Sequence, residues 1–181
     1  MSETTRLVTA DDLLHMPDDG YQYELVRGRL IRMSPPRVWH GIVTMRIGML
    51  LAAHVRARDL GVVFPEVGFK LESNPDTVRA PDMAFLHRER IPPRDSRGYY
   101  KGPPDLAVEV LSPDDRPGEI REKVNDYLTC GTPAVVVIDP DERTVVVHRR
   151  LTPPLTLSAD DTLDLDDVVT GFRCRVREVF D

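Results

Sequence analysis

The longest pattern of apolar residues with helical spacing runs from Val38 to Arg58. Its apolar side chains recur every three or four positions, as one face of a helix requires; they are Ile42, Val43, Ile47, Leu50, Leu51 and Val55. A second such pattern covers Pro117 to Leu128, with proline where the first turn of a helix tolerates it. Gly61 and Gly131 follow these two segments and are expected to end them.

Other stretches carry the apolar patterns of β-strands. Tyr21 to Met33 is expected to form a hairpin that turns at Arg27-Gly28. Asp105 to Leu111 is apolar at both alternating positions apart from Glu109, which predicts a central strand covered on both faces. Further short strands are expected at 62–64, 67–71, 82–86, 134–138, 144–148 and about 162–165.

The order of these elements predicts an α/β fold with a mixed β-sheet flanked by helices. Short helices are also expected near the two ends of the chain, at 9–15 with Thr9 as its N-cap, and near Val176. The prolines fall mostly at junctions between elements, and no internal repeat is visible. We therefore expect a single domain spanning residues 1–181.

Charge and composition narrow the possible functions. The net charge is −6, whereas a protein that grips duplex DNA broadly carries a basic face. A nucleic-acid partner would therefore require a local basic region or a bound metal ion. No apolar run reaches the length of a membrane span, and charged residues near the N-terminus leave no signal-peptide core, so we expect a cytoplasmic protein without membrane contact. Cys130 and Cys174 are expected to be core thiols.

Two carboxylates are the strongest candidates for chemistry. Glu109 lies within an apolar strand, where a lone carboxylate is costly unless it is paired, hydrogen-bonded or bound to metal. The alternative is an edge position in which Glu109 faces solvent or pairs with one arginine. Asp82 stands where the chain enters a predicted strand, and it is either a site residue or a turn aspartate that accepts nearby N–H groups.

Carboxylates on neighbouring strands would form a hard-oxygen site suited to Mg²⁺ or Mn²⁺. A water bound to such a metal can attack a phosphodiester, and the metal stabilises charge on the phosphate oxygens. Lys123 and Lys70 are candidates for an assisting cation. The alternatives are a solvated helix lysine for Lys123 and a surface strand lysine for Lys70.

Several motifs follow one another in a fixed order: Tyr23 to Leu30, Met33 to Pro36, His40, Arg79-Ala-Pro-Asp82, Pro104 to Pro113, Lys123, Tyr127, Gly131 and Ile138-Asp-Pro140. In this combination the chain resembles the Uma2-like family of putative restriction endonucleases, which belongs to the PD-(D/E)XK nuclease superfamily. The resemblance extends from about Thr9 to Phe180. It implies a restriction-endonuclease-like core.

The resemblance also implies roles for the acids. Asp82 matches the metal-binding aspartate, and Glu109 matches the acid of the second half of the motif. The carbonyl of Val110 is then a possible additional metal ligand. Glu24 resembles the extra acid that many members carry on an N-terminal element.

The lysine of the superfamily motif is displaced in this sequence. The superfamily places it two residues after the acid, where this chain has Leu111. The resemblance therefore points to Lys123 on the following helix as the catalytic lysine. His40 and Tyr127 match positions without a role that we can derive; for His40 we consider a phosphate contact or, preferably, a cap of the long helix.

We consider three functions. The leading one is a Mg²⁺-dependent endonuclease that hydrolyses DNA. The second is a nuclease-fold binding or assembly module with weak or no activity, favoured by the acidic charge and by the lack of a recognisable sequence-reading module. The third is a nuclease acting on RNA or another phosphate substrate, which the single tryptophan and few aromatics disfavour because no base-stacking platform is apparent. A homodimer is expected, with the hairpin near Tyr21 and the strand 144–148 as possible sheet edges.

Overall fold

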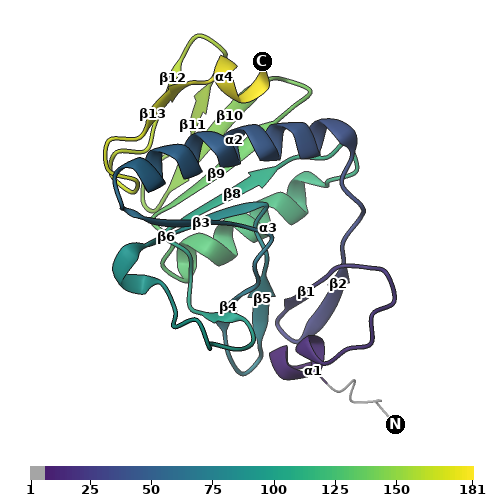
Figure 1. The fold of residues 1–181 in the computed structure, drawn as a ribbon. Coiled ribbons are helices and arrows are strands. Elements are labelled where there is room, and N and C mark those ends of the chain that lie inside the picture. Colours follow the sequence, from purple (N-terminus) through teal and green to yellow (C-terminus); the bar gives the residue numbers. More distant parts are fainter. Residues whose placement is uncertain (1–6) are drawn as a thin grey trace.

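The computed structural model describes residues 7–181, and Figure 1 shows how their helices and strands are arranged. In chain order the elements are α1 (Ala10–Leu14), β1 (Tyr23–Val26), β2 (Arg29–Arg32), α2 (Val38–Ala57), β3 (Gly61–Pro65), β4 (Phe69–Glu72), β5 (Thr77–Arg79), β6 (Met83–His87), the 3₁₀ turn η1 (Arg88–Arg90), β7 (Tyr100–Lys101), β8 (Leu106–Val110), α3 (Pro117–Thr129), β9 (Ala134–Asp139), β10 (Thr144–Arg149), β11 (Leu155–Leu157), β12 (Thr162–Asp164), β13 (Arg173–Arg175) and α4 (Arg177–Phe180).

A six-stranded mixed sheet forms the centre of the fold, with the strand order β11-β10-β9-β8-β6-β3. β8 and β9 are parallel, and their neighbours are antiparallel. α2 packs on one face of the sheet through Val43, Ile47 and Leu51, and α3 packs on the other face through Val124 and Tyr127. All five residues of β8 are buried. The predicted α/β class and the central, doubly covered strand are therefore confirmed.

A second sheet, with the order β2-β1-β5-β4-β7, lies below the first in Figure 1 and packs on α1. It contains the predicted hairpin of β1 and β2. Arg27 and Gly28 form its turn with φ angles of 47° and 75°, as expected where both central residues of a two-residue hairpin turn take positive φ. The capping box of α1, in which Thr9 accepts from the backbone N–H of Asp12, also agrees with the sequence prediction.

The register between β6 and β8 decides where the candidate acids lie. Met83 pairs with Val108, and the two strands are antiparallel. Continuing this register by one residue sets Asp82 opposite Glu109. Two residues far apart in the sequence are thus brought to the same end of two neighbouring central strands.

Several expectations about element ends need correction. Gly61 does not end α2, because the helix stops at Ala57 and Asp59 already has a φ of 54°, while Gly61 begins β3. The strand 144–148 is not a sheet edge, since β11 pairs along it. β2 is an edge, as predicted, and all four of its residues are exposed. β5, β7, β11 and β13 were not predicted; with two or three residues each, they are too short to show a period.

α2 is apolar on two sides. By length and composition alone α2 could cross a membrane, but the core helix of a globular protein passes the same test. In this structure 28% of its most apolar window is buried. Its buried side packs on the sheet, whereas Val38, Trp39, Met45 and Met49 are exposed. Of the two free cysteines, Cys174 is buried and Cys130 is half-buried.

Candidate active site

Glu109 is the centre of a cluster of charged side chains between β8 and α3. Its side chain leaves β8 on the face covered by α3, and the residue is only 4% exposed. Lys123 donates to Oε2 at 3.0 Å, and the Tyr127 hydroxyl donates to Oε1 at 3.0 Å. Lys123 and Tyr127 lie one helical turn apart on α3, so the two donors reach both carboxylate oxygens from one helix face. Neither a solvent-facing position nor pairing with arginine describes this residue.

The protonation state of this cluster follows from burial and from crowded acids. Burial raises the pKa of Glu109 to about 7, and the neighbouring Asp82 and Glu24 carboxylates add to the rise, while Lys123 opposes it. Burial alone would lower the pKa of Lys123, but Glu109 and Glu24 outweigh it and raise that pKa. Lys123 therefore stays charged, and the carboxylates around it carry an excess of negative charge that a cation would relieve.

Asp82 lies at the more open end of the cluster. Its Oδ2 accepts from the backbone N–H of Val110 at 2.6 Å, and its Oδ1 is 3.1 Å from Nε2 of His40. The side chains of Asp82 and His40 are 18% and 11% exposed. The hydrogen bond to Asp82 raises the pKa of His40, although burial opposes the rise.

The preferred reading of His40 as a helix cap is wrong. Arg37 occupies the N-cap of α2, without a side-chain capping bond, and His40 is the third residue of the helix. Its Nδ1 is buried and has no hydrogen-bond partner among residues 7–181. His40 thus belongs to the candidate site through Asp82.

A buried ion-pair network joins the second sheet to this cluster. Arg79 donates to Glu24 at 2.7 Å and to Asp126 at 2.6 and 3.0 Å, and all three side chains are almost fully buried. Glu24 is also 3.4 Å from Nζ of Lys123, and Asp126 accepts from Arg27 at 3.2 Å. The network brings Glu24, on β1, next to the lysine that holds Glu109.

Sequence reasoning assigned no role to Arg79 or Asp126. Arg79 was visible only as the first residue of a motif, and Asp126 follows Lys123 by three positions, a spacing that places both on one side of α3. Lys70, a candidate cation, lies elsewhere: its Nζ is 2.8 Å from Asp76 of its own hairpin. Tyr127 is fully buried and donates to Glu109, so its hydroxyl is placed to hold that carboxylate.

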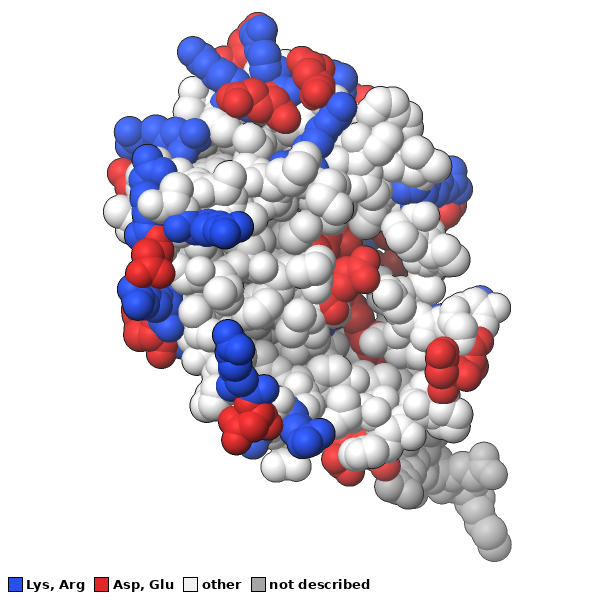
Figure 2. Space-filling model, viewed as in Figure 1, with Lys and Arg blue, Asp and Glu red and all other residues white. Residues whose placement is uncertain are grey.

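Figure 2 shows Asp and Glu side chains gathered in a hollow of the surface, between the end of α2 that carries its first turn and the hairpin of β1 and β2. A cavity of about 750 Å³ lies along α3, but its lining, which includes Ile120 and Leu128, contains none of the cluster residues. The clustered carboxylates and the buried lysine, rather than the volume of a cavity, therefore identify the hollow as the candidate site.

The donor set fits a hard divalent cation. Carboxylate oxygens have lone pairs beyond those used in one hydrogen bond each, so Asp82 and Glu109 can still coordinate. Within residues 7–181 no three His, Cys, Asp or Glu side chains form a ready-made ligand set. A metal held here would thus rest on the two acids and complete its coordination with water or substrate oxygens. Coordination by the Val110 carbonyl stays a prediction.

Replacing Tyr127 by phenylalanine tests the clamp on Glu109. We expect the free energy of unfolding to fall by about 1–2 kcal/mol, because a buried hydrogen bond to Glu109 is lost while the ring still fills its place. Urea unfolding at pH 7 measures this. Tyr99→Phe is a matched control, because Tyr99 is half-buried and packs on the core around Leu13 and Leu25 rather than on the cluster. An equal loss in both variants would contradict a specific role for Tyr127.

Comparisons with known proteins agree with this architecture. The model of the family Uma2, described as "putative restriction endonuclease", matches residues 10–177. A crystal structure of a putative nuclease belonging to DUF820, from Anabaena variabilis ATCC 29413, is similar with a TM-score of 0.84 and 22% sequence identity, covering 96% of this chain and 97% of that chain. At this identity the likeness shows the fold alone. No curated protein matches the chain.

Proposed function

The chain belongs to the Uma2 family of restriction-endonuclease-like proteins, and on this premise we propose that it hydrolyses DNA phosphodiester bonds with Mg²⁺ or Mn²⁺ held by Asp82 and Glu109. The observation that supports the proposal most is the position of the two carboxylates, on neighbouring central strands and beside a buried lysine. We further propose one domain over the whole chain and a cytoplasmic location.

Each residue of the cluster has a distinct part in this proposal. The bound cation would supply a water of lowered pKa and would stabilise charge on the phosphate. Lys123 favours the ionised form of Glu109 and offers positive charge to the phosphate oxygens. Tyr127 fixes the orientation of Glu109, and Glu24 holds Lys123 from the other side.

Cleavage of supercoiled plasmid in Mg²⁺ or Mn²⁺ tests the proposal. We expect the wild type to give nicked and linear products. These products should be absent when a chelator is added, and absent with Asp82→Asn or Glu109→Gln. Both substitutions keep the side-chain shape and remove the charge. Glu89→Gln changes an exposed acid outside the cluster and should cleave as the wild type does. The proposal is wrong if the wild type does not cleave the plasmid, or if the two site variants still cleave it.

A specific observation favours a second candidate, a nuclease-fold binding or assembly module. Both oxygens of Glu109 and both oxygens of Asp82 already have polar partners, so the cluster is satisfied without metal. Titration calorimetry with Mn²⁺ separates the candidates: a protein without cleavage and without a binding heat at the two acids supports the module.

A homodimer is also part of the proposal. The exposed edge strand β2 offers unpaired backbone groups to a second copy. Light scattering at micromolar concentration measures the mass, and a monomer would exclude this pairing.

The metal-free protein should be more stable in mild acid than at neutral pH. Burial raises the pKa of Glu109 from 4.5 to about 7, so between these values the folded protein binds more protons than the unfolded chain, and the free energy of unfolding falls as the pH rises. His40, whose pKa is also raised, acts in the same direction. Urea unfolding in chelator at pH 5, 6 and 7 measures the slope. Glu109→Gln should flatten it, and an unchanged slope in this variant would contradict the assignment.

A further inference from the structure

The first turn of α2 carries two large apolar side chains that are exposed at the candidate site. Val38 is 76% exposed and Trp39, the only tryptophan of the chain, is 59% exposed. Trp39 immediately precedes His40, whose ring contacts Asp82. An exposed indole thus lies at the same helix end as the side chain that touches a proposed metal ligand.

The surroundings of Trp39 are unusual for an acidic chain. From Met33 to Arg58 the sequence contains no aspartate or glutamate. Figure 2 shows a largely uncharged surface over α2 and carboxylates in the hollow beyond its end. Those carboxylates repel phosphates when no metal is bound, and Arg37 at the N-cap of α2 is already paired with Asp114. A substrate therefore needs contacts besides charge at this end of the helix.

The opposite wall of the hollow is also partly apolar. Glu24 pairs with Ile31 across the hairpin, so the two side chains share one face of the second sheet. Ile31 is exposed, whereas Glu24 is buried in the cluster. Apolar side chains therefore stand on both elements that border the acids, α2 and β2.

We propose that Trp39 is a stacking platform for an unpaired base of single-stranded DNA that enters the hollow. The inference rests on the proposed function and adds a substrate class to it. A base stacks on an aromatic ring whatever its identity, and bases inside a duplex do not offer their faces. Single strands, frayed ends and gaps would then be bound in preference to intact duplex. No base-stacking platform was apparent from the sequence, because a lone tryptophan gives no pattern there.

The single tryptophan makes the test direct. A fluorescein-labelled twelve-nucleotide oligothymidine is titrated in Ca²⁺ and followed by anisotropy, and the unlabelled strand is followed by tryptophan emission. We expect quenching of the emission and a Kd that rises about tenfold in Trp39→Ala. Trp39→Phe keeps an aromatic face and should stay within about threefold of the wild type.

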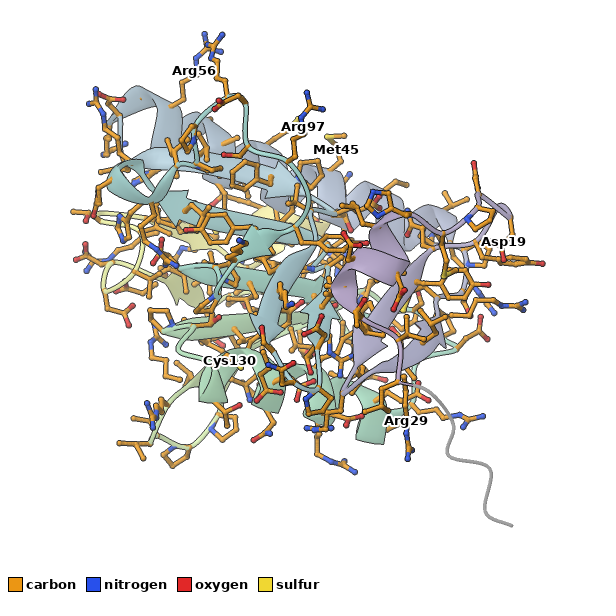
Figure 3. All side chains as sticks on the ribbon, turned by 90° about the horizontal axis from the view of Figure 1, so that it is seen from below. Asp19, Arg29, Met45, Arg56, Arg97 and Cys130 are labelled. Carbon is orange, nitrogen blue, oxygen red and sulfur yellow. The ribbon has the colours of Figure 1, made fainter. Side chains whose placement is uncertain are left out.

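Met45→Ala is the matched control. Met45 is 58% exposed on the same helix, and in Figure 3 it projects with Arg97 on the side of the molecule opposite Arg29 of the hairpin. This variant should bind the oligonucleotide as the wild type does. A duplex of the same length should bind more weakly than the single strand and should not distinguish Trp39→Ala from the wild type.

Three results would overturn the inference. One is an unchanged Kd in Trp39→Ala together with unquenched emission, and another is equal loss in Met45→Ala. The third is a tryptophan emission that changes with protein concentration in the absence of DNA, in parallel with the molecular mass. That result would mean that a second copy of the chain covers Trp39. Plasmid cleavage together with the first of these results would refute the inference but not the proposed hydrolysis. Quenching without cleavage would support the inference and refute the proposed hydrolysis.

Discussion

Lys123→Met should lower the rate of metal-dependent DNA cleavage by at least about 100-fold. Methionine keeps the length and burial of the side chain but removes the charge that lies 3.0 Å from Glu109 and 3.4 Å from Glu24. Without it the pKa of Glu109 rises from its value of about 7, and the carboxyl is protonated where a metal needs it ionised. Initial rates of plasmid nicking between pH 6 and 9 measure the loss.

Lys70→Met separates the two lysines considered from the sequence. Lys70 is paired with Asp76 in the hairpin of β4 and β5, so its replacement should leave the cleavage rate within about twofold of the wild type. A large loss in this variant, with little change in Lys123→Met, would move the catalytic charge to Lys70. Circular dichroism of both variants shows whether they keep the fold.

The largest effect on stability is expected from Arg79→Met, which should reduce the free energy of unfolding by about 3–5 kcal/mol. Arg79 pairs with Glu24 and Asp126 in a region that water hardly reaches. Its removal leaves two buried carboxylates without their main partner, and this costs far more than the ion pair itself contributes. Urea unfolding at pH 7.5, where carboxylates are normally ionised, measures the difference.

Arg173→Met is the control for this variant. Arg173 also bonds two aspartates, Asp164 and Asp166, but all three side chains are exposed. Solvent and salt screen such pairs, and we expect little change in stability. Similar losses in the two variants would show that the Arg79 network is not special. The double variant Arg79→Met with Asp126→Asn should recover part of the loss, because one unpaired charge is removed.

The sequence was sufficient where a residue conflicted with its own neighbourhood. Glu109 stood among apolar residues at both alternating positions, and this conflict predicted burial with a partner before any fold was known. The spacing of Lys123 and Tyr127 placed them on one side of a helix that follows the Glu109 strand. The long helix, the hairpin and the central strand were predictable for the same reason, since each shows a clear period over many residues.

Contacts between segments that are far apart in the chain could not be predicted from the sequence. His40 was interpreted as a local cap because its partner, Asp82, comes just before β6, and three other strands lie between them in the chain. The Arg79–Asp126 pair joins β5 of the second sheet to α3, and no periodicity in the sequence predicts such a contact. Lys70 was considered for the site although its partner, Asp76, is close in the sequence. The contact was not predicted because β5, the second strand of that hairpin, was not predicted.

The register of β6 and β8 makes the spacing of Asp82 and Glu109 independent of the segment that joins their strands. Residues 91–99, which pair with no strand, can lengthen, shorten or acquire a new recognition element in a descendant protein without moving either carboxylate. An insertion of one residue inside β6 or β8 is different, because it would turn one acid to the other face of the sheet. Diversification of this scaffold toward new targets should therefore concentrate in that connection, while the two strands keep a constant length.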